Sequence, residues 1–387
     1  MGVMAMLRLS LVPILCGKTL AESFMGFTTS TIVVDFLGIG AQIERLNAAL
    51  SLQPADYAAA TFEFNRQVSQ TGLSLRNISA CGPTANVPSC SAEPFARYAS
   101  YWGSQEYMHH FVGPILASST PYGWSLDDDA RRELVMKSTV LEGVLMAVLV
   151  RVHLAAETCL QRPLDEAWAL YAGSSTDGPI RLAEKRAPQF GTEATSGDFS
   201  AGRSRINSEV LQLFEDMQLR ITSGNCDVAT MQGVANQIQS KLLVPIIQGL
   251  LREAWESDPM LFYLTGGADG FLEVVEGWAF SRAVLPLVDA CSTLAGTTIA
   301  ANMDRIYLGP NGTHFVPEGF DAVKGALEST YACLGISCSD VNAMVDTVTG
   351  EFLWQPCNGA GFAVAGSSRI TWHFMALAAS LFVFLSL

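Results

Sequence analysis

Basic residues are scarce in this chain of 387 residues. Lysine and arginine together number 23 against 37 aspartates and glutamates, which gives a formal net charge of -14. An acidic surface of this kind repels phosphate backbones and anionic headgroups and attracts cations. We therefore expect no nucleic-acid partner.

Familiar catalytic and metal-binding signatures are also missing. The chain contains no GxSxG elbow, no P-loop, no HExxH and no CxxC, and its Gly-Ile-Gly at 38–40 does not extend to a dinucleotide fingerprint. Alternating strand patterns are scarce, whereas the long segments carry helical periodicity. The sequence therefore predicts a mainly α protein, and nothing in it singles out a catalytic triad.

A repeated pattern predicts two related halves. The stretches YAGSSTDGPIRLAEKRA (171–187) and YLTGGADGFLEVVEGWA (263–279) share Tyr, Asp-Gly, Glu and Ala at identical internal positions. Self-similarity at a fixed offset indicates duplicated architecture. We predict an internal duplication with a first helical half at 30–190, a linker at 191–206, a second helical half at 207–345 and a C-terminal segment at 346–358.

Both ends of the chain are typical of processing signals. Residues 1–23 combine one arginine, a short apolar run and small residues, as a secretory signal peptide does; an ordinary apolar terminus is the alternative. Near the other end, small residues from Asn358 precede a spacer and a 16-residue apolar tail. This order predicts a GPI site at Asn358 with a propeptide at 359–387. The alternatives are a site at 366–368, a marginal membrane helix or a buried terminal helix.

Cysteines and sequons agree with export. Eight cysteines follow the predicted signal, an even number that suits disulfides in an oxidising compartment. Local pairs Cys81/Cys90 and Cys333/Cys338 are the simplest guess, although spacing alone does not fix the pairing. The remaining four are Cys159, Cys226, Cys291 and Cys357. Sequons at Asn77 and Asn311 are predicted to carry glycans.

The repeated residues carry hard oxygen donors. Tyrosine, aspartate and glutamate suit small, highly charged cations, and a bound cation favours the deprotonated form of a coordinating group. We predict metal ligands at Tyr171, Asp177, Glu184, Tyr263, Asp269 and Glu276. The alternative is purely structural: a packed Tyr, an Asp-Gly turn and a solvated Glu would also recur after a duplication.

A second, unduplicated group lies on an apolar segment at 140–156, which we predict to be a buried core helix and not a membrane span because charged residues interrupt it. At 3.6 residues per turn, Glu142, His153 and Glu157 would share one side of a helix, with Arg151 opposite. Such groups are costly to bury unless they are paired or bound to metal, so these three are secondary metal candidates, with a structural salt bridge as the alternative. The i, i+3 pairs Glu253/Glu256 and Glu273/Glu276 look like exposed acidic faces.

Several phrases resemble one protein family. DEAWALYAG, LAEKRAPQFGT, EGWAFSRAVLPLV, YWGSQEYM and LNAALSLQPADYAAA are similar to stretches of the algal iron-assimilating proteins, a low-iron and high-carbon-dioxide inducible periplasmic family related to phytotransferrins. The resemblance spans about residues 32–340.

The resemblance implies a non-enzymatic function. It implies capture of ferric iron (Fe³⁺) at the outer face of the plasma membrane, with carbonate as a partner anion, and delivery to uptake machinery. An anion beside Fe³⁺ needs a cation, and the candidates are Arg186, Arg282, Arg151 and Lys241. The alternatives are a surface adhesion or structural protein without metal, and a secreted metal-dependent enzyme.

Overall fold

The predicted mainly α class is confirmed. The computed structural model describes residues 23–68, 72–79, 89–117, 126–174, 176–195, 200–258, 270–304, 316–346 and 349–357, and 69% of these are helical. Residues 1–22 of the predicted signal peptide and the whole GPI propeptide, together with Asn358, Asn311, Cys81, Tyr263 and Asp269, lie outside the described residues.

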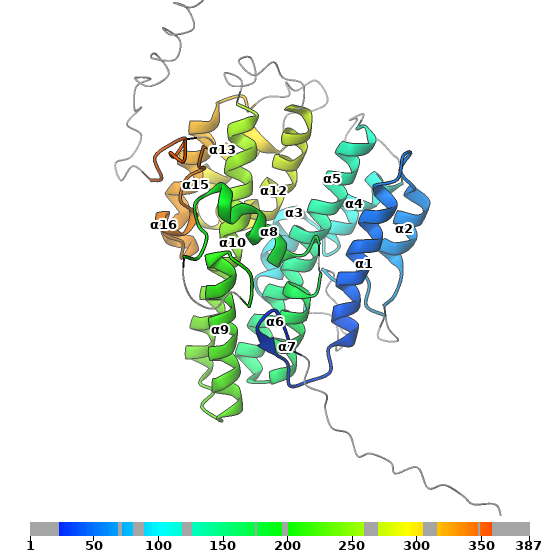
Figure 1. Ribbon diagram of the computed structural model, residues 1–387, viewed down its shortest axis with the longest axis vertical. Helices are drawn as coiled ribbons and strands as arrows, with labels where there is room; N and C mark the ends of the chain where they lie inside the picture. Colours follow the sequence, from blue (N-terminus) through cyan, green and yellow to red (C-terminus); the bar gives the residue numbers. More distant parts are fainter. Residues whose placement is uncertain are drawn as a thin grey trace, which may run out of the picture.

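The elements follow one another along the chain with a single short β-hairpin at the start (Figure 1). They are β1 (Ser23–Phe24), β2 (Phe27–Thr28), α1 (Val34–Leu50), α2 (Tyr57–Asn65), α3 (Phe95–Trp102), α4 (Tyr107–Leu116), α5 (Asp128–Ser138), the π-helix η2 (Thr139–Val144), α6 (Leu145–Thr158), α7 (Gln161–Ala172), α8 (Pro179–Gln189), α9 (Arg205–Thr222), α10 (Val228–Glu256), α12 (Gly270–Cys291), α13 (Thr293–Met303), α15 (Phe320–Leu334) and α16 (Cys338–Val341).

The centre of the molecule is a bundle of long helices. α5, η2 and α6 form one continuous helical segment whose α6 part packs on α7 and α10, while α12 packs on both α10 and α5. This segment, 128–158, is long and apolar enough to cross a membrane, but 94% of its most apolar window is buried inside the protein. The prediction of a buried core helix is therefore confirmed.

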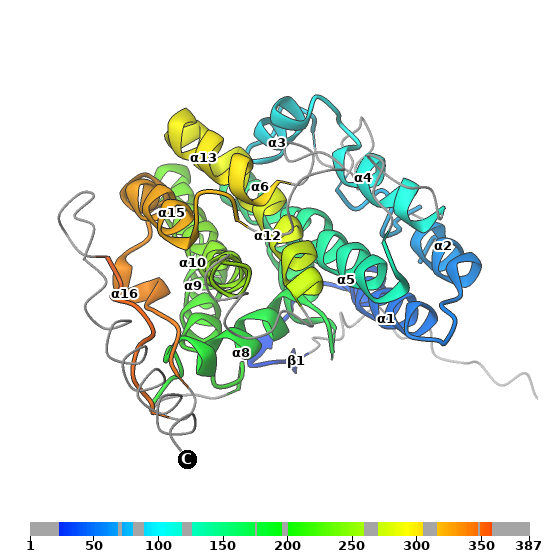
Figure 2. The same ribbon diagram turned by 90° about the horizontal axis from the view of Figure 1, so that it is seen from above.

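Shorter helices cover the bundle on two sides. α1 and α2 lie at one edge and α15 and α16 at the opposite edge, as both views show (Figures 1 and 2). Buried apolar residues from both predicted halves belong to one continuous hydrophobic core, which includes Ile39 near one edge and Leu327 near the other. The predicted duplication and its domain boundaries stay predictions.

Disulfides connect elements that are distant in the sequence. The structure pairs Cys159 with Cys226, Cys291 with Cys333 and Cys338 with Cys357. The local pair Cys333/Cys338 is therefore wrong: Cys333 lies at the end of α15 and faces the end of α12, whereas Cys338 begins α16. Cys90 is also disulfide-bonded.

Local signals set the helices that border the site described below. The side chain of Asp127 accepts a hydrogen bond from the amide of Ala130 and caps α5, whose first turn also carries acidic residues. α8 starts with Pro179 in its first turn, directly after Gly178. The predicted glycosylation residue Asn77 is half-buried, and its amide donates to the Gly72 carbonyl.

Candidate functional site

Two predicted ligands of the first repeat, Tyr171 and Glu184, meet at Asn207 instead of at a cavity. The Tyr171 hydroxyl donates to Asn207 Oδ1 at 2.5 Å, and Asn207 Nδ2 donates to Glu184 Oε1 at 2.9 Å. Burial raises the pKa of Tyr171 far above its ordinary value, and the Glu184 carboxylate adds to the shift. A phenolate at this position is therefore disfavoured, and Tyr171 serves the packing of α7 against α9.

Glu184 secures the predicted linker to α8. Its carboxylate accepts the backbone amides of Arg203 at 3.0 Å and Ser204 at 2.7 Å, beside the start of α9. Gly202 has φ +101°, and a Cβ there would lie 2.3 Å from Glu184 Oε1, so the approach requires glycine. Three donors occupy this carboxylate, which gives Glu184 a structural role.

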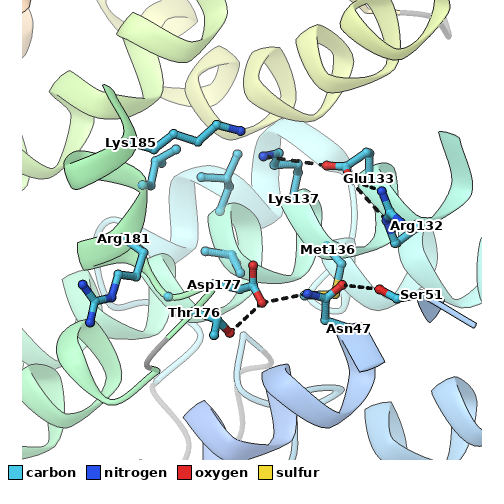
Figure 3. A pocket seen from close by; sticks show the side chains of 14 residues that line it. Asn47, Ser51, Arg132, Glu133, Met136, Lys137, Thr176, Asp177, Arg181 and Lys185 are labelled. Carbon is cyan, nitrogen blue, oxygen red and sulfur yellow. Dashed lines mark hydrogen bonds and ion pairs between the residues drawn. The ribbon is translucent and has the colours of Figure 1, made fainter. Parts of the chain in front are cut away.

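Asp177 differs from these two residues because it borders a cavity of about 310 Å³. Asp177 Oδ2 accepts a hydrogen bond from Asn47 of α1 at 2.9 Å and another from Thr176 (Figure 3). The cavity lies between the end of α1, the α5–η2 segment and the start of α8. Its charged lining residues are Arg132, Glu133, Lys137, Asp177, Arg181 and Lys185.

Two lysines face each other across this cavity. Figure 3 shows the ammonium groups of Lys137 and Lys185 directed toward one another. Lys137 Nζ lies 3.8 Å from Glu133 and 3.5 Å from Glu276. Lys185 has no ion pair or hydrogen bond from its side chain to any described residue. The charge of Lys137 is the main reason that the pKa of Lys185 lies below its ordinary value.

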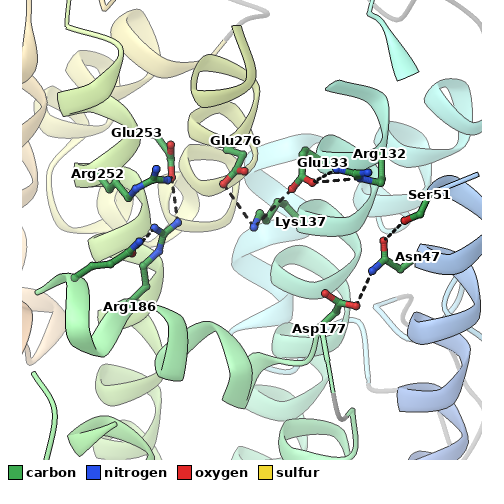
Figure 4. A network of polar contacts seen from close by, with 11 residues as sticks. Asn47, Ser51, Arg132, Glu133, Lys137, Asp177, Arg186, Arg252, Glu253 and Glu276 are labelled. Carbon is green, nitrogen blue, oxygen red and sulfur yellow. Dashed lines mark hydrogen bonds and ion pairs between the residues drawn. The ribbon is translucent and has the colours of Figure 1, made fainter. Parts of the chain in front are cut away.

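Beyond Lys137 the charges continue into the interior (Figure 4). Arg186 and Glu253 are both fully buried, with Arg186 Nη2 3.0 Å from Glu253 Oε1. Arg252 Nη1 lies 2.8 Å from the same oxygen, and its Nη2 lies 2.6 Å from Glu256. The pairs Glu253/Glu256 and Glu273/Glu276 thus belong to facing helices, α10 and α12, and the expectation of exposed acidic faces is wrong for Glu253.

Burial raises the pKa values of the carboxyl groups in this network, and neighbouring cations lower them. Burial raises the pKa of Glu253 to about 7, and Arg186 only partly offsets the effect. Its Oε2 is buried without a hydrogen-bond partner among the described residues. For Glu276, burial alone would raise the pKa, but the charges of Lys137 and Lys185 lead the cations that lower it. Glu276 is therefore an ionised partner of the two lysines.

The secondary metal candidates do not come together. Glu142 lies in the π-helix, which breaks the 3.6-residue spacing, and it forms a bidentate pair with Arg282, both distances being 3.0 Å. Each ring nitrogen of His153 lies 3.2 Å from a glutamine oxygen of α10. Glu157 is exposed. The salt-bridge alternative is thus confirmed for Glu142.

The predicted anion partners already have carboxylate partners. Arg282 pairs with Glu142, Arg151 Nε lies 3.3 Å from Glu166, and Lys241 Nζ contacts Glu209 and Asp340 at 2.7 and 2.6 Å. Arg186 pairs with Glu253. Only Arg186, through the network, approaches the cavity that Asp177 borders.

Sequence reasoning missed Lys137 and Lys185, the two cations that face each other at the cavity. Lys185 stands inside the repeated stretch, but the second copy has Gly277 at the same position. Lys137 belongs to no motif or repeat in the sequence. For Lys137, the available signal is its position just before the apolar run at 140–156, because a charge next to a buried segment requires a partner.

No family model, no curated protein and no solved structure matches the chain. In addition, no three histidine, cysteine, aspartate or glutamate side chains within the described ranges are placed to hold one metal ion.

Proposed function

We propose that the protein binds ferric iron together with a small anion in the cavity between α1, α5 and α8. The observation that supports this proposal is the mixture of charges on the cavity wall: the carboxylates of Asp177 and Glu133 and the ammonium groups of Lys137 and Lys185 line the same space. A metal ion alone would favour carboxylates, and an anion alone would favour cations. The wall offers both.

The metal would take only part of its coordination from the protein. Hard cations surround themselves with about six or more oxygens, and the described carboxylates do not gather in threes. Asp177 and Glu133 are the protein ligands that we propose, and oxygens of the anion and of water complete the shell. Of the predicted set, Asp177 is kept as a ligand and Glu276 becomes the counterion of Lys137.

We place this binding outside the cell. Disulfides that join distant helices suit an oxidising compartment, and the net charge of -14 attracts cations to the surface. Attachment through a GPI anchor, carbonate as the anion and delivery to uptake machinery remain parts of the proposal.

Iron retention tests the function. The purified protein is mixed with ferric iron in bicarbonate buffer, desalted and assayed for bound metal and for its thermal midpoint. We expect about one ferric ion per chain and a higher midpoint, because a ligand that binds only the folded state stabilises it. Asp177→Asn should lower retention at least tenfold, whereas the matched variant Asp216→Asn, which changes an aspartate on the exposed side of α9, should not. Equal retention by the parent and Asp177→Asn would remove the proposed site.

A further inference from the structure

Lys185 is the exception among the cations that surround the interior network. Arg186, Arg252 and Lys137 each have a carboxylate within 4 Å. Lys185 faces another ammonium group and has no carboxylate within 4 Å among the described residues, so Glu276 attracts it only at longer range. Two like charges that face each other raise the free energy of the folded state. An anion placed between them would convert the repulsion into two attractions.

The cavity has more room than one carbonate ion fills. Its volume is about 310 Å³, whereas one water molecule accounts for roughly 30 Å³ in the liquid. Its wall also presents the start of α8 at Gly178, where no side chain caps the helix, whereas the Ser51 and Thr176 hydroxyls already donate to Asn47 and Asp177. An uncapped helix start suits a ligand with several oxygen atoms.

The acidic side of the wall restricts the kind of anion. Asp177 and Glu133 repel the part of an anion that lies next to them, so a metal-free anion would be held at the lysine side of the cavity alone. A chelator that carries its own metal has the opposite polarity at its two ends, with free carboxylates at one end and the metal at the other. The lysines suit the first end and the two carboxylates suit the second.

We propose that the ligand of this cavity is a small polycarboxylate chelator of the citrate class, one carboxylate of which lies between Lys137 and Lys185. This inference rests on the proposed function and specifies its anion, because the chelator would bring ferric iron with it and supply most of the oxygens around the metal. It replaces carbonate with a larger anion that spans the cavity.

Arg181 provides a matched control on the same helix. It lies one turn before Lys185, lines the same cavity and has no side-chain partner among the described residues. Figure 3 shows its guanidinium directed away from the two lysines. Both variants remove one partly exposed cation from α8, so any difference between them reports the position of the charge and not the net charge of the protein.

Calorimetric titration with metal-free citrate tests the inference. We expect the parent to bind citrate, Lys185→Ala to bind it at least tenfold more weakly, as for the loss of one charge-assisted contact, and Arg181→Ala to change the affinity less than twofold. Acetate at the same ionic strength should not compete. Absence of citrate binding, equal losses in the two variants, or competition by acetate would each overturn the inference.

Iron retention from ferric citrate and from ferric iron in bicarbonate separates this inference from the function. Retention from both sources, with Lys185→Ala impaired only for citrate, supports both proposals. Retention from bicarbonate without citrate binding keeps the function and overturns the chelator. Citrate binding without retention of iron from either source keeps the anion site and overturns the ferric function.

Discussion

Two charged clusters, one around Glu142 and one around Lys137, lie close together on the long segment formed by α5, η2 and α6. They differ in how their charges are compensated. At Glu142 the carboxylate and Arg282 form a bidentate pair, and the guanidinium lies 3.9 Å from the Trp102 ring centroid and 3.8 Å from that of Phe111. At Lys137, one turn earlier, the charges reach a cavity, where Lys185 has no ion pair within 4 Å among the described residues and the Lys137 charge lowers its pKa.

The difference explains why we assign a structural role to the first cluster and propose a binding role for the second. Glu142 and Arg282 neutralise each other between aromatic rings, so neither charge is left for a ligand. The geometry of this pair also fixes how α12 lies against the long segment. A network with an uncompensated cation at its open end gains free energy from any anion that fits. The distinction depends on compensation more than on burial, because Glu253 is as fully buried as Glu142.

Breaking the closed pair should have the largest effect. Arg282→Ala leaves Glu142 buried without its counterion, and we expect a loss of about 3–5 kcal/mol in the free energy of unfolding. Denaturant unfolding followed by circular dichroism measures it. Arg97→Ala, which removes an exposed partner of Glu93 on α3, should cost less than about 1 kcal/mol. Equal losses of stability in the two variants would show that the buried pair contributes no more to stability than the exposed one.

Glu253 should give the network a dependence on pH. Its pKa is raised from 4.5 to about 7, so the folded protein binds this proton more tightly than the unfolded chain. This group therefore lowers stability as the pH rises from about 4.5 to about 7, and the loss persists above that range. Glu253→Gln removes the titration and should gain up to about 3 kcal/mol relative to the parent between pH 4 and pH 8.

Unfolding free energies at several pH values measure this effect. The exposed Glu157→Gln on α6 is the control, because it makes the same substitution at a surface position outside the network. If Glu253→Gln instead loses stability relative to the parent as the pH rises, the attraction of Arg186 outweighs the cost of burial, and the pKa of Glu253 is lowered.

The sequence predicts the helices better than it predicts the site. Helical periodicity predicts the long segment, and the apolar run at 140–156 gives a buried helix, but the structure and not the sequence identifies Asp127 as the cap of α5. The periodicity cannot indicate a π-turn, which adds a residue to one turn and moves Glu142 away from His153. Nor can an i, i+3 pattern indicate that another helix covers Glu253, because coverage depends on contacts between distant segments. The repeat led to Asp177, but its tyrosine and glutamate serve packing.

Removing the charge of Lys185 should have the smallest effect on stability. It should stabilise the protein, whereas Arg282→Ala should destabilise it. Because Lys137 lowers the pKa of Lys185, the protonated lysine destabilises the folded state at neutral pH, and this cost disappears as the pH rises toward the ordinary lysine value of 10.5. Lys185→Gln should therefore stabilise the ligand-free protein at pH 7, by no more than about 0.5 kcal/mol since Lys185 is exposed and solvent screens the repulsion.

The gain should shrink when salt is added, because screening weakens the same repulsion. Thermal midpoints of the parent and of Lys185→Gln, recorded at low and at high ionic strength, measure it. A variant that is less stable than the parent at low salt would mean that Lys185 already has a favourable partner. The open end of the network would then be as well compensated as the Glu142–Arg282 pair, and the contrast between the two clusters would disappear.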